Sequence, residues 1–334
     1  MDTRSTHSFL GECLLSHKSL PPKNRELSSA VNTSLDPNVT TSQSSEYDDA
    51  HTSGEVVDGC TNQRHNSGCC SHTQGDPALY EAWWQIDLGD QVVIEYVKIY
   101  YRGDGSHQTA RFAGYQVYLS NTTGWRNSDI CHNDTTSTQS MVDLTPRITS
   151  CTGNTRYLTI YVDRQTLAYS WYSAKAILEL CEVQVYGCPV GKYGNSNCGS
   201  NCDATCVNSL CHPNSGQCTY CAAGFYKAEV RCIPCSQNCL NDVCDVETST
   251  CSACISGYYG SQCDQSCPDN CPDKICDQYS GVCTECVPGV FGPNCTQTCP
   301  VSCQDKCERN TVFDLHTCSS EYIEPGKTGH FNTL

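Results

Sequence analysis

Apolar and polar residues alternate in five short segments of the first half of the chain, which is the pattern of half-buried β-strands. The segments are WWQIDL (83–88), VIEYVKIYY (93–101), GYQVYLS (114–120), RYLTIYVD (156–163) and LCEVQVYG (180–187). Clusters of Gly, Asn, Asp, Ser and Thr separate them, and no stretch keeps a 3.6-residue apolar period for three turns. We therefore predict an all-β fold, an antiparallel β-sandwich or jelly roll, over residues 24–187.

Cysteine replaces this pattern in the second half of the chain. Of the 31 cysteines in 334 residues, 24 lie within residues 188–318, where large apolar side chains are sparse. Six-cysteine units start at Cys202, Cys235 and Cys267, and Cys299 opens a fourth, with steps of 33, 32 and 32 residues. Such a period indicates an array of small units. Units this short cannot bury enough apolar surface, so disulfides must hold them together.

These patterns divide the chain into four parts. They are a disordered leader over 1–23, the sandwich over 24–187, the array over 188–318 and a polar tail over 319–334. Within the array we predict a half unit over 188–198, full units over 202–232, 235–263 and 267–295, and a partial unit over 299–318.

The cysteine density indicates an oxidising and therefore extracellular location. Five N-glycosylation sequons agree with it, at Asn32, Asn38, Asn121, Asn133 and Asn294. The leader is no convincing signal peptide, because Glu12 interrupts its apolar residues, and no run of 18 apolar residues could span a membrane. We expect a natural chain that starts earlier and continues beyond Leu334. It would be a secreted protein or the ectodomain of a membrane-anchored one, and an oligomer is compatible with either.

Charge and motif content exclude two classes of function. The net charge of −16 argues against nucleic-acid binding, which needs a basic surface. No Ser-His-Asp or Cys-His arrangement indicates an enzyme. Four Cys-x-x-Cys pairs, such as Cys218/Cys221, allow a redox centre or a zinc site. Their place in the repeat favours neighbouring cysteines of separate structural disulfides.

The units of the array resemble the EGF-like repeat, especially the tandem type of scavenger and phagocytic receptors. The resemblance rests on six cysteines with a Gly-aromatic step before the last, as in SGYYGSQC and PGVFGPNC. It implies pairing of the first cysteine with the third, the second with the fourth and the fifth with the sixth. It also implies three bridges outside the full units: Cys188–Cys198, Cys299–Cys307 and Cys303–Cys318.

The first domain resembles the F-type lectin (fucolectin) domain, a discoidin-like, calcium-containing β-sandwich that binds fucose. CCSHT, WWQIDL, VKIYYRGD, RFAGYQV and LCEVQVYG carry the resemblance in this order. The family has a His, then Arg-x-Asp, then a second basic residue. These positions fall here on His72, Arg102-Gly103-Asp104 and Arg111.

Their chemistry suits a neutral sugar. Two guanidiniums offer rigid sets of donors to hydroxyl groups, and His72 can donate or accept. Asp104 can hold the guanidiniums in place. The methyl group of fucose needs an apolar wall, for which Tyr47 is the candidate, with His51 nearby. An Arg-Gly-Asp followed by an aligned Arg111 favours this sugar site over a cell-adhesion tag or an ordinary solvated rim.

The lectin resemblance also implies a Ca²⁺ site and a disulfide scheme. The metal candidates are Glu55, Asp58, Cys60, Cys69, Cys181 and Glu182, of which the cysteines would offer backbone carbonyls. The family pairing gives Cys70–Cys181 and Cys131–Cys151. Cys60–Cys69 is the remaining local pair, which leaves Cys13 unpaired.

The expected function is that of a calcium-dependent lectin on an EGF-like stalk, which binds fucosylated or related glycans in recognition or innate defence. Two alternatives remain open. In one, the chain is a scavenger or adhesion receptor whose array contacts the partner. In the other, the sandwich is a discoidin-like binder of lipid or protein.

Overall fold

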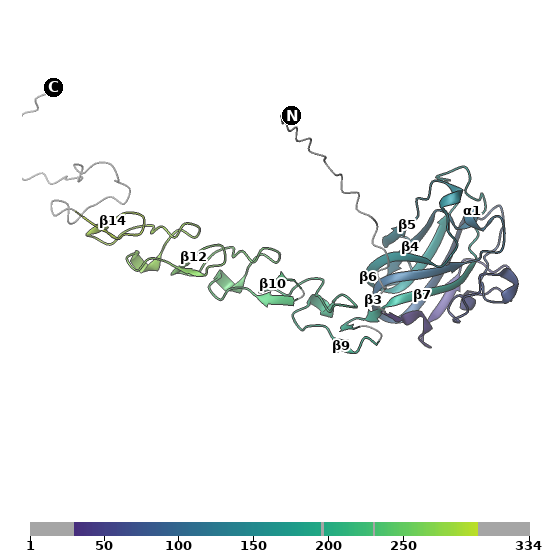
Figure 1. Ribbon diagram of the computed structural model, residues 1–334, viewed down its shortest axis with the longest axis horizontal. Coiled ribbons are helices and arrows are strands. Elements are labelled where there is room, and N and C mark those ends of the chain that lie inside the picture. The colour runs from purple at the N-terminus through teal and green to yellow at the C-terminus, as the bar shows by residue number, and fades with distance from the viewer. Residues whose placement is uncertain (1–29, 195–196, 230, 300–334) are drawn as a thin grey trace, which may run out of the picture.

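The computed structural model describes residues 30–194, 197–229 and 231–299. In these residues a β-sandwich is followed by a string of small disulfide-linked units that extends away from it (Figure 1). The predicted all-β class, with an antiparallel sandwich before a disulfide-rich array, is confirmed. The leader with Cys13, the bridges Cys299–Cys307 and Cys303–Cys318, and the tail lie outside the described residues. Across the described ranges, no helix has the length and apolar character needed to cross a bilayer.

The sandwich is built from seven antiparallel strands. They are β1 (Val31–Asn32), β2 (Thr40–Gln43), β3 (Glu81–Tyr101), β4 (Tyr115–Ser120), β5 (Asp129–Asn133), β6 (Arg147–Asp163) and β7 (Leu180–Pro189). Their order is β1-β7-β3-β6-β4-β5, with β2 paired to β3. The pairing of β3 with β6 shifts register between Asp87 and Val92 and again between Ile94 and Tyr96. Such irregularities increase bending and twist, so these long strands can curve around the core.

The core lies where the alternation places it. Trp84 and Ile86 are fully buried and Leu88 is 6% exposed, while Val183 and Val185 on β7 are fully buried. The predicted segments correspond to β3, β4, β6 and β7. The strands missing from the prediction, β1, β2 and β5, are short and partly exposed. Edge strands of this kind need little apolar patterning, which explains the omission.

Short helical turns lie in the loops between the strands. They are η1 (Thr33–Leu35), η2 (Ser53–Val56), η3 (His65–Ser67), α1 (Gln108–Phe112) and η4 (Gln139–Met141) in the sandwich, and η5 (Val207–Ser209), η6 (Leu240–Asp242) and η7 (Pro272–Lys274) in the array. Of these, η2, η3 and α1 carry residues of the candidate sites described below.

The array consists of two-stranded ribbons held by disulfides. Its ribbons are β8 (Lys192–Tyr193) with β9 (Ser200–Asn201), β10 (Phe225–Ala228) with β11 (Arg231–Pro234), β12 (Tyr258–Tyr259) with β13 (Gln265–Ser266), and β14 (Val290–Phe291) with β15 (Gln297–Thr298). All three full units have the pairing that the EGF-like resemblance implied, which is Cys202–Cys211, Cys206–Cys218 and Cys221–Cys232 in the first. Cys218 and Cys221 thus belong to separate bridges, as the repeat indicated.

The same backbone bond joins each unit to the next. The amide of Cys235 donates to the carbonyl of Gly224 over 2.8 Å, and the amide of Cys267 donates to that of Gly257 over 2.8 Å. Both glycines have a positive φ, of 84° and 96°, which side chains other than glycine rarely adopt. At the sandwich end, Cys188–Cys198 closes the half unit directly after β7. Repeated joints of one geometry account for the extended form of the array (Figure 1).

Candidate functional site

The candidate sugar-binding residues meet around a carboxylate that the sequence analysis did not include, that of Glu179. His72 Nε2 lies 3.2 Å from Glu179 Oε1, and Arg102 Nη1 lies 2.6 Å from the same oxygen. Arg111 Nη1 lies 3.0 Å from Glu179 Oε2. Glu179 is fully buried, so a single interior carboxylate positions all three basic side chains.

The backbone fixes these side chains from three directions. Arg102 follows the last residue of β3, and its amide donates to the Glu179 carbonyl over 3.0 Å. Arg111 comes from α1. The residues flanking His72 pair with the segment that contains Glu179, because Ser71 and Thr73 donate their amides to carbonyls on either side of it. The Cys70–Cys181 bridge locks these two segments together.

The environment keeps Glu179 ionised. Burial alone would raise the pKa of its carboxyl, but the hydrogen bond with His72 and the charge of Arg111 outweigh burial and lower the pKa to about 2. His72 Nδ1 lies 2.6 Å from the Thr73 carbonyl, which can only accept. This nitrogen therefore carries a proton, which fixes the ring orientation and aims Nε2 at Glu179.

Asp104 braces Arg102, as expected, but Arg111 is held by Glu179. Arg102 Nε donates to Asp104 Oδ1 over 2.5 Å, and the other carboxylate oxygen accepts the His65 amide over 3.0 Å. The Arg102 side chain is 18% exposed and that of Arg111 is 23% exposed. The charged ends of Arg102-Gly103-Asp104 thus bind each other and the domain, and they do not project from a loop tip.

Four aromatic rings line one side of this cluster. The Tyr47 ring centroid lies 4.6 Å from that of His72, and Tyr47 is 55% exposed. His51 and His65 stack with centroids 4.4 Å apart. The structure thus brings Tyr47 and His51 beside His72, where the wall for a methyl group was expected, and adds His65 from η3.

Two residues of the cluster escaped the sequence analysis. Glu179 lies in the run Ala176–Leu180, in which every residue is at most 3% exposed. A charged residue flanked on both sides by inward apolar residues was a usable signal. The sequence gives no such signal for His65, because nothing in the loop 61–68 predicts that this loop folds over Asp104 and His51.

We predict that the imidazole of His65 makes the fold sensitive to acid. Burial and the neighbouring Arg102, His51 and His72 lower its pKa below 6.5, and only Glu179 acts in the opposite direction. The unfolded chain therefore binds this proton first, so stability falls as the pH drops below about 6.5. Melting temperatures at pH 7 and pH 5 should differ more for wild type than for His65→Gln. Equal differences would contradict the prediction.

The candidate calcium ligands lie in two places, the buried Glu182 carboxylate on β7 and the loop around Asp58. Glu182 on β7 is fully buried, and its Oε2 accepts the Gly59 amide over 3.2 Å. Its Oε1 has no hydrogen-bond partner among the described residues. Burial, with the nearby Asp58 carboxylate, raises the pKa of Glu182 to about 7. Glu55 lies on η2, three residues before Asp58, and η2 packs against β7.

The sandwich contains the three expected disulfides. They are Cys60–Cys69, Cys70–Cys181 and Cys131–Cys151. Cys60–Cys69 closes the loop that follows Asp58, and Cys70–Cys181 joins the end of this loop to β7, directly before Glu182. In the array, the sulfurs of Cys239, Cys251 and Cys263 lie close together, but each belongs to a disulfide and is no metal ligand.

Several solved structures are similar to part of the chain. The chain is similar to a solved fucolectin from the serum of striped bass, Morone saxatilis, with 22% identity and a TM-score of 0.38 over 47% of this chain and 48% of that chain, about half its length. A fucose-binding module of Streptococcus pneumoniae has 25% identity and a TM-score of 0.34, over 47% and 95% of the two chains. A chitosan-binding module of Paenibacillus sp. IK-5 has 19% identity and a TM-score of 0.35, over 47% and 99%.

No curated protein matches the chain. Residues 39–182 match the profile of one protein family, described as the F5/8 type C domain. The match covers β2 to the start of β7, and with them every residue around Glu179. Over these residues the chain is therefore similar to the F5/8 type C, or discoidin-like, domain.

Proposed function

We propose that this protein is a calcium-dependent lectin that binds a neutral sugar of the fucose type at the cluster around Glu179. The array presents the domain outside the cell as an EGF-like stalk. The observation that carries the proposal is the geometry of Arg102, Arg111 and His72 around one buried carboxylate, next to the exposed ring of Tyr47.

The charge balance of the cluster favours a neutral ligand. Glu179 and Asp104 offset the positive charges of Arg102 and Arg111. Arg102 Nη2 and the Nε and Nη2 groups of Arg111 have no partner among the described residues, and both side chains reach the surface. Such N–H groups can donate to sugar hydroxyls, and because their positive charge is already offset by the carboxylates, the ligand needs no negative charge. The two carboxylates match the two guanidiniums, so only His72, when protonated, would add positive charge for a phosphate or sulfate.

The wall of rings provides the apolar contact. A fucose ring carries a methyl group, and the exposed face of Tyr47 beside His72 can cover it. Hydroxyl recognition from the arginines and apolar contact from Tyr47 then act on opposite sides of one sugar.

Ca²⁺ would act on the scaffold and not on the sugar. The unpartnered Glu182 Oε1 and the Asp58 carboxylate, with carbonyls of the bridged cysteines, are the hard oxygen donors that this ion takes. Bound there, the ion would fix the Asp58 loop to β7 beside the Cys70–Cys181 bridge, two residues from His72. The site residues Glu55, Asp58, Cys60, Cys69, Cys181 and Glu182 remain part of this proposal.

Chelation is therefore expected to lower both the melting temperature and sugar affinity. Asp58→Ala should lower the melting temperature and the sugar affinity as chelator does, because the same ion is lost. Chelator should then have no further effect on this variant. Asp129→Ala, an exposed carboxylate on β5, is the control and should respond to chelator like wild type. A melting temperature that chelator leaves unchanged in wild type would show that no ion binds at this place.

The array gives the lectin reach and valency. One sugar site binds weakly, and linked sites raise avidity without new contacts. Such avidity suits glycan recognition or innate defence by a secreted protein or by the ectodomain of a membrane protein. Oligomers of the chain would link sugar sites in the same way.

A glycan array probed with the full chain tests the proposed function. Fucosylated glycans should bind, free fucose should compete, and chelator should weaken the signal. Binding to anionic lipid vesicles without fucose competition would instead favour a discoidin-like lipid binder. A partner that binds through the array and ignores fucose would favour the scavenger or adhesion receptor.

A further inference from the structure

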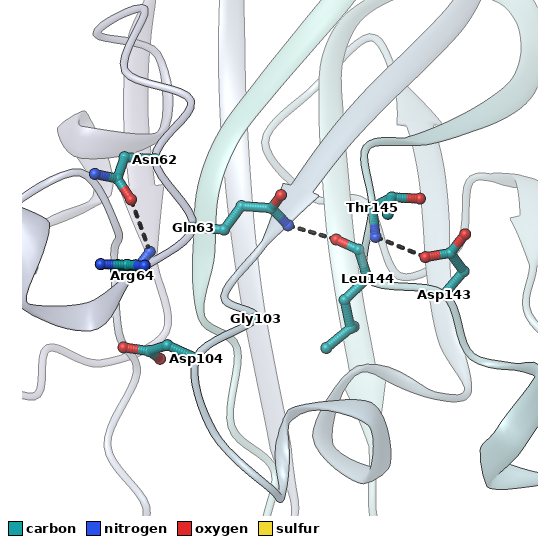
Figure 2. A pocket seen from close by; sticks show the side chains of 8 residues that line it. All are labelled: Asn62, Gln63, Arg64, Gly103, Asp104, Asp143, Leu144 and Thr145. Atoms are coloured by element: carbon teal, nitrogen blue, oxygen red, sulfur yellow. Dashed lines mark hydrogen bonds between the residues drawn. The ribbon is translucent and has the colours of Figure 1, made fainter.

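A hollow of about 540 Å³ adjoins the cluster around Glu179. It lies between the loop of Asn62 and Arg64 and the loop of Asp143–Thr145, and Asp104 is part of its wall (Figure 2). We propose that this hollow binds a second, neutral sugar ring of a glycan whose terminal sugar occupies the cluster. The inference rests on the proposed function and extends it from a single sugar to an oligosaccharide.

The floor of the hollow is preorganised by Gln63. Its side-chain amide donates to the carbonyl of Tyr101 over 2.5 Å and to that of Leu144. The backbone carbonyl of Gln63 accepts the Gly103 amide over 2.8 Å. Figure 2 shows Gln63 reaching from one loop to the other. The two sides of the hollow are therefore held at a fixed separation before any ligand arrives, which lowers the entropy cost of binding.

The rim offers both donors and acceptors. Asn62 Oδ1 accepts the Arg64 amide over 3.3 Å, which leaves the NH₂ group of Asn62 for a ligand. Asp143 Oδ1 accepts the Thr145 amide over 2.9 Å, and a carboxylate accepts several hydrogen bonds, so Asp143 can also accept from a ligand hydroxyl. The exposed guanidinium of Arg64 has no ion-pair partner within the described ranges. Sugar hydroxyls donate and accept, so they match such a mixed rim.

The hollow is also balanced in charge and offers an apolar contact. Arg102 already offsets Asp104, and Asp143 balances Arg64, so the hollow has no excess positive charge that would favour an anionic ring. The half-buried side chain of Leu144 lies among these polar groups and can cover the C–H face of a ring (Figure 2). The volume lies within the range of about 300–1,000 Å³ that is typical of small-ligand sites.

Asp104 connects the cluster around Glu179 with the hollow. It braces Arg102 in the cluster and lines the hollow. A glycan whose first ring is bound by Arg102 can place the next ring in the hollow. The second contact is then intramolecular and costs little further entropy. Affinity for a fucosyl trisaccharide should exceed that for free fucose by about tenfold or more.

The test compares these two probes by calorimetry on the full chain. Thr145→Trp fills the hollow from its exposed rim and should reduce trisaccharide affinity to the level of free fucose, while fucose affinity stays unchanged. The control is Asn127→Trp, which places the same bulk in a hollow of about 520 Å³ lined by Asn121 and Asn154. It should leave both affinities unchanged.

The outcomes separate the inference from the proposed function. Equal affinities of wild type for fucose and trisaccharide, unaffected by Thr145→Trp, would overturn the second subsite and leave the lectin intact. Loss of fucose binding in Thr145→Trp would also overturn it, because Thr145 would then belong to the first site. Failure of wild type to bind either probe would overturn the proposed function, and the inference with it.

Discussion

Replacing Glu179 with glutamine is expected to abolish sugar binding and to lower the free energy of unfolding by about 3 kcal/mol. The neutral amide keeps the shape of the side chain but removes the charge that holds Arg102, Arg111 and His72. The expected loss is at the lower end for a broken buried pair, because both guanidiniums retain 18–23% exposure to water. Without their shared anchor, the arginines also repel each other and leave the geometry that a sugar needs.

Chemical denaturation and glycan binding measure the two effects. The matched control is Glu81→Gln, which breaks the exposed ion pair with Arg126. Exposed pairs contribute at most about 1 kcal/mol, so this control should keep both stability and binding. If Glu179→Gln were as stable as Glu81→Gln and still bound glycan, the central carboxylate would have no organising role.

Arg102→Lys is expected to weaken sugar binding at least about tenfold, although it conserves the charge. Arg102 donates from Nε to Asp104 and from Nη1 to Glu179, which leaves Nη2 for the ligand. A lysine has one nitrogen in place of this planar set and cannot serve both carboxylates in the same geometry while also donating to a sugar. Loss of one charge-assisted bond corresponds to about 1.5–3 kcal/mol.

Arg156→Lys is the control for this substitution. Arg156 also binds a carboxylate through two nitrogens, with Nε and Nη2 at 2.7 and 2.9 Å from the oxygens of Asp87, but on a different part of the sheet. Its replacement should leave affinity unchanged. Similar affinities of Arg102→Lys and wild type for a fucosylated glycan would contradict a direct role of this guanidinium.

The fold was predictable because its main determinants are local. Period-two alternation identified β3, β4, β6 and β7, which contain the buried core, and the cysteine period identified the units of the array. Short edge strands such as β5 carry no such signal, because no residue of β5 is fully buried. The bends of β3 and β6, which shape the sandwich, depend on packing and not on any short motif.

The candidate site was predictable only in part. The resemblance led to His72, Arg102 and Arg111, and the structure brings them together. The resemblance could not identify Glu179 as their common partner, because Glu179 lies 68 to 107 positions away from these residues in the sequence. Likewise, His65 enters the cluster through the loop that its amide ties to Asp104. Both depend on how distant segments fold against each other.

Binding of Arg111→Ala to an immobilised fucosylated glycan, with free fucose as competitor, tests the central claim most directly. Arg111 is required by a sugar site around Glu179, but it lies outside the Arg-Gly-Asp tripeptide and plays no part in an adhesion tag. We predict that wild type binds and is displaced by fucose, and that Arg111→Ala loses at least about tenfold in affinity. Fucose-competed binding of Arg111→Ala equal to that of wild type would contradict a sugar site at this cluster.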